Sequence, residues 1–418
     1  MDRIYAVVIV VLCAVFISAS PAVAFETNEL TLEQAISLAL EKNPELQTLR
    51  LEEESAKGQN EKARLLLINN PTIEGSISKK DRPGEEGGGK FTNYGFKLSQ
   101  EFEVAGQRGA RINVSEKELA RVKLEIRDKE RILISDVKDA FTKVLSLKKK
   151  SSLARENVRL NEELLGYTKI KFQAGDVSGL DVNLSEVELS KAKKELLLAE
   201  REYRESLLAL QGLLGLSPDM SFAIEGDLPS EAPALPDKEA LKALALSHRP
   251  DSKAAAFEIE KTEFALKLAK KEAFPNITLS GFYDRDERRN AVGLEISVPL
   301  PFFDRKQAEK KEAFAKAEGA KIKAAGLKKT IEREVDQAFN DITSAIEELS
   351  LFKKEILVKA AENLDLLNLG FKEGKIGFFE VRLAQKDTIE AQFAYIEAQT
   401  RTQLALNAIE KITGGAVK

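Results

Sequence analysis

Two segments in the first half of the chain alternate polar and apolar side chains: Thr72-Ile73-Glu74-Gly75-Ser76-Ile77-Ser78 and Asn93-Tyr94-Gly95-Phe96-Lys97-Leu98-Ser99. The second half has two more, Ile277-Thr278-Leu279-Ser280-Gly281 and Val292-Gly293-Leu294-Glu295-Ile296-Ser297-Val298. A period of two residues gives a strand one apolar face and one polar face. The sequence therefore predicts four strands, at about 71–80, 91–102, 275–284 and 290–299.

Two such faces suit a sheet that separates lipid from a water-filled lumen. A sheet in lipid must close, because an open edge leaves backbone groups unpaired, and bacterial barrels start at about eight strands. Four strands cannot close, so one chain cannot span a membrane alone. Two copies would supply about eight strands around a filled interior, and three about twelve around a wider lumen, which favours three copies for a conduit.

The strands belong to an internal repeat of about 200 residues. Matching segments keep their order at a nearly constant spacing: Leu38-Ala39-Leu40 with Leu244-Ala245-Leu246, Pro44 with Pro250, and Phe172-x-x-Gly175 with Phe371-x-x-Gly374. Chance similarity between charged helices would not keep that order. The predicted organisation is a first repeat over 25–216, a proline-rich connection over 217–237 and a second repeat over 238–418.

Each repeat also predicts helices. In the first repeat a helical segment starts at Thr31, which can form a capping box with Gln34, and is interrupted at Pro44. Much longer helices follow at about 110–172 and 178–214, with counterparts at about 306–371 and 378–412. The longest would reach about 90 Å and must pack side by side, as coiled coils do. The expected fold is mainly α with a small β part.

The first 24 residues predict a cleaved export signal. Arg3 is followed by an apolar run over 4–17, and Ala22-Val23-Ala24 fits the cleavage pattern. Cys13, the one cysteine, lies in this segment, and Leu12 stands where a lipoprotein signal needs a small residue. The remaining chain is expected to be exported, cysteine-free and without a helical membrane span.

Composition excludes several functional classes. The chain has 64 Lys+Arg against 68 Asp+Glu, one His, one Cys, two Met and no Trp. This balance does not attract nucleic acid, and the usual Cys and His ligands of a zinc site are missing. A nucleophilic triad would have to rest on His248 and Cys13. The sequence predicts no enzyme, no cofactor and no resident metal site.

The export signal, the duplicated helix–strand–strand–helix–helix plan and the Phe-x-x-Gly hairpins resemble the outer membrane efflux proteins of the TolC type, over residues 31–412. Two segments, Gln100-Glu101-Phe102-Glu103-Val104-Ala105-Gly106-Gln107-Arg108 and Val298-Pro299-Leu300-Pro301-Phe302-Phe303-Asp304-Arg305, are similar to its cobalt-zinc-cadmium metal-efflux branch. The resemblance implies a homotrimer in the bacterial outer membrane, with a twelve-stranded barrel (four strands from each of three chains) and a helical tunnel through the periplasm. It also implies a periplasmic adaptor and an inner-membrane resistance-nodulation-division pump as partners.

In that family the hairpins form the periplasmic tip, where the adaptor docks and the tunnel closes. The resemblance makes Phe172, Gly175, Phe371 and Gly374 candidate docking residues. It makes Asp181, Lys375, Glu380 and Arg382 a candidate aperture gate, in which repelling carboxylates need cationic partners to close. Alternatively, Asp181 and Glu380 face solvent or favour the N-terminal dipole of the returning helix. Leu383 stands where some family members have a second acidic residue.

Two other functions fit parts of the pattern. A conduit for type I protein secretion would share the whole architecture and differ in cargo. A periplasmic coiled-coil scaffold would explain the helices, but it does not require four alternating strands. We expect an exit duct that conducts metal cations or small toxic compounds passively.

Overall fold

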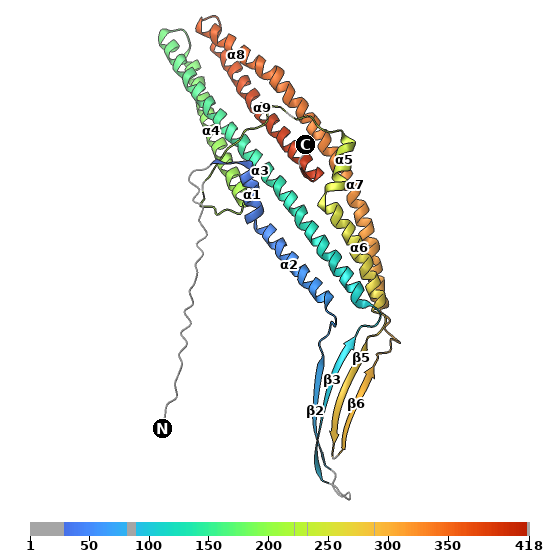
Figure 1. The fold of residues 1–418 in the computed structure, drawn as a ribbon. Helices are drawn as coiled ribbons and strands as arrows, with labels where there is room; N and C mark the ends of the chain where they lie inside the picture. Colours follow the sequence, from blue (N-terminus) through green and yellow to red (C-terminus); the bar gives the residue numbers. More distant parts are fainter. Residues whose placement is uncertain (1–28, 82–88, 221, 232, 288, 416–418) are drawn as a thin grey trace, which may run out of the picture.

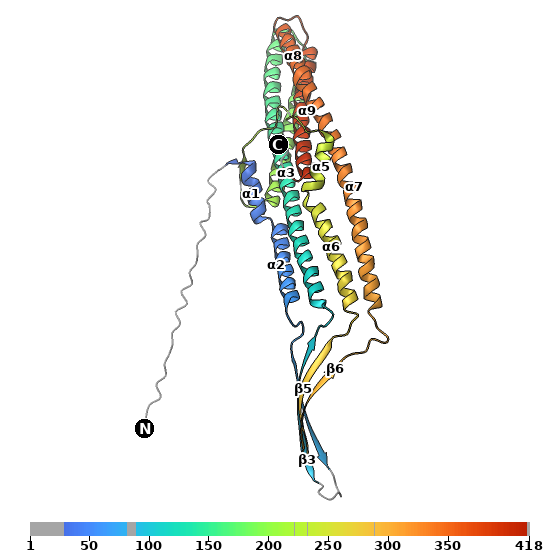
Figure 2. The ribbon, with the colours of Figure 1, turned by 45° about the vertical axis from the view of Figure 1, so that its right-hand side comes forward.

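The computed structural model describes residues 29–81, 89–220, 222–231, 233–287 and 289–415, so the predicted signal peptide lies outside the described residues. The chain is elongated, with a β-sheet at one end and the turns of two helical hairpins at the other (Figures 1 and 2). Figure 1 also shows α1 and α5 partway along the helical part. The end of the chain that carries the sheet is therefore far from the end that carries the hairpin turns. Helix α3 alone, with 68 residues, spans about 100 Å.

The alternating segments form one antiparallel sheet in the order β2-β3-β5-β6. Its strands are Thr72–Asp81 (β2), Lys90–Phe102 (β3), Ile277–Asp286 (β5) and Arg289–Ser297 (β6). These bounds lie within about three residues of those expected from alternation. Pairing of Thr72 with Ser99 and of Ser99 with Ser280 sets one register across three strands.

This register sorts the side chains onto two faces. On one face, Lys97 forms an ion pair with Glu295 at 2.8 Å, and the Asp284 carboxylate lies over Gly95. The other face carries exposed apolar side chains: Ile73, Ile77, Phe96, Leu98, Val292, Leu294 and Ile296. A polar face and an uncovered apolar face are what a sheet between water and lipid requires.

A shorter helical pair precedes the strands in each repeat. It consists of α1 (Leu32–Lys42) and α2 (Pro44–Arg64) in the first repeat, and α5 (Lys238–His248) and α6 (Pro250–Lys271) in the second. The predicted capping box of Thr31 and Gln34 is confirmed, as is the interruption at Pro44. Asn43 caps α2 by accepting from the backbone N–H groups of Glu45 and Leu46.

Long helices follow the strands. They are α3 (Gln107–Ala174) and α4 (Gly179–Leu213) in the first repeat, and α7 (Gln307–Leu351), α8 (Leu357–Lys372) and α9 (Phe378–Thr413) in the second. The helix expected over 306–371 is present, and it contains a π-helical turn, η1 (Phe352–Ile356), between α7 and α8. A π-turn inserts an extra residue into a helix. Nothing in the sequence indicates this insertion, because neither the hydrophobic pattern nor a helix-breaking residue marks it.

The proline-rich connection contributes a small element that the sequence did not predict. Its residues Ala223–Ile224 (β4) pair in parallel with Glu29–Leu30 (β1). Ile224 is fully buried, and Lys148 of α3 donates to its carbonyl oxygen at 2.8 Å. The connection is therefore fastened to the first repeat rather than merely joining two halves.

The core consists of contacts between helices. The predicted stripe of Val137, Phe141, Val144 and Leu145 on α3 is buried, together with Leu210 of α4. In the second repeat Ile331, Val335 and Ile342 of α7 pack on Leu241 of α5 and Ile409 of α9. Side-by-side packing of long helices is confirmed.

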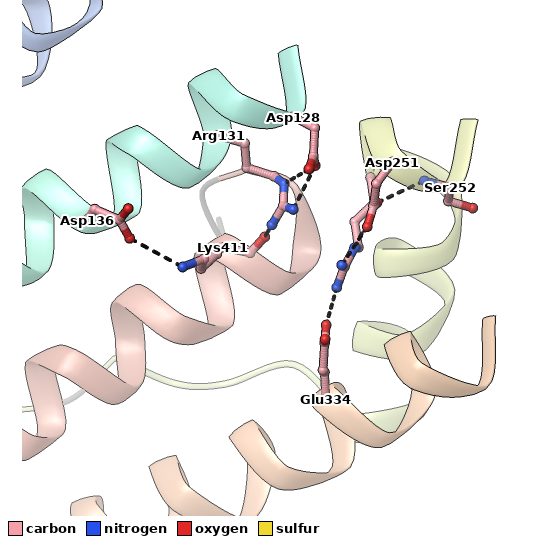
Figure 3. A network of polar contacts seen from close by, with 8 residues as sticks. Asp128, Arg131, Asp136, Asp251, Ser252, Glu334 and Lys411 are labelled. Atoms are coloured by element: carbon pink, nitrogen blue, oxygen red, sulfur yellow. Dashed lines mark hydrogen bonds and ion pairs between the residues drawn. The ribbon is translucent and has the colours of Figure 1, made fainter. Parts of the chain in front are cut away.

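A polar cluster joins four helices near the end of α9 (Figure 3). The buried Arg249 forms ion pairs with Asp251 at 2.7 Å and with Glu334 of α7 at 2.6 Å. On α3, Arg131 binds Asp128 and donates to the carbonyl oxygen of Lys411 in α9. The cluster fixes the start of α6 and the end of α9 against their neighbours.

We expect the Arg249–Asp251 contact to weaken in acid. Burial alone would raise the pKa of the Asp251 carboxyl, but the hydrogen bond and charge of Arg249 outweigh it, so the pKa lies below the usual 3.8. The ionised carboxyl therefore stabilises the folded chain above pH 3.8, and this contribution is lost as the pH falls through the lower folded value.

Asp251→Asn should accordingly lower the free energy of unfolding by about 1 kcal/mol at neutral pH, and the difference from wild type should vanish in strong acid. Urea unfolding followed by far-ultraviolet circular dichroism measures this difference. Asp176→Asn, at an exposed turn position, is the matched control. A deficit that stays constant from neutral pH to strong acid would contradict the assignment.

Candidate functional site at the hairpin end

The first hairpin turns through a glycine in the left-handed region. α3 ends at Ala174, and Gly175 has φ 85°, a conformation that costs L-residues free energy. Its N–H bonds to the Phe172 carbonyl oxygen at 3.0 Å, and the Asp176 N–H bonds to that of Lys171 at 2.9 Å. These bonds satisfy the last carbonyl groups of the helix.

Asp181 lies at the third position of the returning helix α4. Its carboxylate accepts from the Ser178 N–H at 2.9 Å and from the Ser178 hydroxyl at 2.8 Å. The Ser178 Oγ in turn accepts from the Asp181 N–H, which completes a capping box. Within one chain, the Asp181 side chain is thus engaged with the helix start.

The second hairpin repeats the turn at Gly374, which has φ 73°. The Lys375 N–H bonds to the Gly370 carbonyl oxygen at 2.9 Å. Glu380 is again at the third position of the returning helix, and a Cβ on Gly377 would come within 2.6 Å of its Oε2. The Glu380 carboxylate therefore folds back over the start of α9, where the helix dipole favours negative charge.

Two polar contacts join the hairpins to each other. Lys171 donates to the Phe371 carbonyl oxygen at 3.0 Å, and its Nζ lies 4.2 Å from the centre of the Phe371 ring. Arg382 of α9 forms an ion pair with Glu188 of α4 at 2.6 Å. A small apolar cluster lies beside these contacts: Phe371 and Val381, with Leu164, Leu367 and Ile376.

The predicted cations have other partners than the predicted carboxylates. Lys375 pairs with Glu373 at 2.6 Å, and Arg382 pairs with Glu188. Sequence reasoning missed Glu188, although it lies one heptad after Asp181 and so on the same face of α4. It also missed Lys171, whose counterpart in the second repeat is Gly370.

The two hairpin phenylalanines differ in exposure. Phe371 is only 6% exposed because it packs between the hairpins, whereas Phe172 is 49% exposed. Of the predicted docking residues, Phe172 and the two turn glycines are thus available on the surface, and Phe371 supports the hairpin from inside.

Metal ligands do not gather in the part of the chain that the structure describes. Across the residues that it describes, no three His, Cys, Asp or Glu side chains come together in a way that could hold a metal ion. His248 is exposed, and its Nδ1 lies 2.9 Å from the Ser247 Oγ. None of the described helices is long and apolar enough to cross a membrane.

A sheet with one apolar face, continued by hairpins of long amphipathic helices, defines one segment of a tubular outer-membrane channel. The chain belongs to the outer membrane efflux protein family, whose model matches residues 35–216 and 241–415. The first matched range lies within the predicted first repeat, and the second lies within the predicted second repeat.

Similar proteins agree with this assignment. The cobalt-zinc-cadmium resistance protein CzcC of Cupriavidus metallidurans is 26% identical over 92% of this chain and 90% of that protein. The pyoverdine export outer membrane protein OpmQ of Pseudomonas aeruginosa is 23% identical over 77% of this chain and 69% of its own length. Among solved structures, the outer-membrane channel OprN has a TM-score of 0.79 at 20% identity, covering 92% of this chain and 90% of that one.

The protein is therefore an efflux channel of the outer membrane that extends into the periplasm. Trimers with this fold form a barrel continued by a helical tunnel, and the four strands of one chain are one part of that barrel. Channels of this family work in tripartite efflux systems, and their fold is that of passive channels rather than enzymes. A secretion conduit or a periplasmic scaffold is not favoured.

Proposed function

We propose that this chain forms, as a homotrimer, the exit duct for metal cations or small toxic compounds delivered by a resistance-nodulation-division pump and a periplasmic adaptor. The proposal rests on one observation, namely that the two ends of the chain have different structures. One end offers a sheet with a lipid-facing and a polar surface, and the other offers paired hairpin turns. The similarity to CzcC along nearly the whole chain favours metal cations as cargo, and OpmQ marks small organic compounds as the second class.

Conduction requires polar walls rather than binding sites. On the polar face of the sheet, carboxylates and a lysine line the path that the barrel encloses: Glu74, Asp284, Glu295 and Lys97. Because the described residues contain no cluster of metal ligands, cations would keep their water shell and would pass without binding tightly.

The hairpin end is proposed as adaptor dock and gate. Gly175 and Gly374 set the two turns, and Phe172 offers an exposed apolar side chain to the adaptor. Asp181 and Glu380, three copies of each in the trimer, surround the aperture. The Arg382–Glu188 ion pair ties the two hairpins of each chain together, so that widening the aperture requires this contact to rearrange.

A gene deletion tests the cargo. We expect the deletion strain to lose tolerance to zinc, cobalt or cadmium salts several-fold, and the wild-type gene on a plasmid to restore it. Measuring growth across metal and antibiotic concentrations, with secreted protein assayed in parallel, gives the comparison. Unchanged tolerance together with lost protein export would overturn the efflux proposal in favour of secretion.

A further inference from the structure

The sheet has two free edges that fit one another. β2 runs away from the helices from Thr72, and β6 returns toward them and ends at Ser297. A second copy can therefore add its β2 antiparallel to β6, as the trimer in the proposed function requires. Because Thr72 and Ser297 lie at the helical end of the sheet, the segments next to them leave the sheet at about the same level.

Both of these neighbouring segments expose apolar side chains. Between α2 and β2, Leu65-Leu66-Leu67 leaves Leu66 78% exposed. Between β6 and α7, Leu300 is 68% and Phe303 94% exposed. None of these side chains belongs to an apolar cluster of the described residues. A single chain leaves this surface uncovered.

The corresponding junction inside the chain is closed by polar contacts. There the link from β3 to α3 meets the link from α6 to β5. Asn276 donates to the Glu101 carboxylate at 2.7 Å, and Lys271 donates to the Gly106 carbonyl oxygen at 2.9 Å. The Gln107 side-chain amide donates to the Asn276 Oδ1 at 3.2 Å. In a duplicated chain, the junction between copies is the counterpart of this one.

The first part of the link from β6 to α7 differs from its counterpart inside the chain. Every side chain over residues 298–303 is apolar, so this stretch lacks the side-chain donors and acceptors that close the inner junction, and polar residues begin again at Asp304. Contact of residues 298–303 with a neighbour then comes from packing of apolar side chains. Leu65-Leu66-Leu67, on the opposite edge, offers surface of the same kind.

We infer that residues 65–67 of one copy pack against residues 298–303 of the next copy, forming an apolar clasp where the sheet becomes helices. The clasp rests on the proposed trimer. Each copy presents both halves on opposite edges, so the contacts run head to tail around the ring. The junctions in the ring therefore alternate between polar ones within a chain and apolar ones between chains.

Cysteine pairs test the clasp directly, because the only native cysteine, Cys13, lies in the predicted signal peptide. The variant Leu66→Cys/Leu300→Cys, treated with a short bismaleimide, should give covalent dimers and trimers on a denaturing gel. Each single variant should stay monomeric, since a head-to-tail contact does not bring identical residues together. The mass of the wild-type complex in detergent is measured alongside and should correspond to three copies.

Substitutions supply a second measurement. Leu66→Asn should speed dissociation of the detergent-solubilised trimer about tenfold, as expected for loss of a buried apolar contact. Phe274→Asn is the matched control, because Phe274 is 62% exposed on the junction inside the chain and should leave the rate unchanged.

The outcomes separate the clasp from the trimer. A three-copy mass without crosslinks would overturn the clasp and leave the assembly intact, whereas a wild-type monomer would remove the assembly itself. Labelling of Phe303→Cys by a photoreactive lipid, without crosslinking in the double variant, would assign this surface to the bilayer instead.

Discussion

Gly374→Val should abolish crosslinking of the channel to its adaptor while leaving the channel in the outer membrane. Gly374 has φ 73°, where a β-branched side chain strains the backbone, at a cost of about 1–2 kcal/mol. Apart from Gly374 and its two chain neighbours, no heavy atom of the described residues lies within 4 Å of the position a Cβ would take, so the effect comes from the backbone and not from a steric clash. The sheet is about 100 Å away and should form normally.

The measurement compares the amount of channel in the outer membrane with the yield of adaptor crosslinks in whole cells. Gly374→Asn is the matched control, because asparagine tolerates the left-handed conformation better than other residues, and it should retain most of the crosslinking. Normal crosslinking in Gly374→Val would refute the docking role of this turn.

Glu380→Gln should change ion selection without changing the fold. Three carboxylates are neutralised at once in the trimer, so the preference for cations over anions should fall about twofold or more. The side chain is exposed and lies over Gly377, so its loss removes little packing. Single-channel recording in a salt gradient measures the reversal potential from which this preference is calculated.

Glu231→Gln, in the connection between the repeats, is the control for a general charge effect. If Glu380→Gln conducts like wild type, Glu380 acts at the start of its own helix and not in the aperture.

Much of the architecture could be predicted from the sequence because its signals are local. Alternation over seven residues reports a two-faced strand directly, as at residues 72–78. Thr31 and Gln34 specify a helix start within one turn, and Gly175 and Gly374 specify the hairpin turns by their freedom at positive φ.

The contacts of the hairpin end could not be predicted, because they join residues that are distant in the chain. Arg382 pairs with Glu188, nearly two hundred residues away. Other carboxylates lie closer to Arg382 in the sequence, and nothing in the sequence indicated that Glu188 would be its partner. The π-helical turn at Phe352–Ile356 also left no local pattern. The exposures of Phe172 and Phe371 differ because Phe371 packs between the hairpins, a contact between segments that are distant in the chain.

This difference between the hairpins bears on symmetry. The proposed trimer has six hairpins at its tip but only threefold symmetry, because Phe172 is exposed in one kind and Phe371 is buried in the other. A partner with six equivalent arms would have to bind in two distinct ways, three times each. A partner whose arms come as three unlike pairs would match the ring without such a compromise, so the difference between the two hairpins of one chain bears on how many adaptor arms can bind alike.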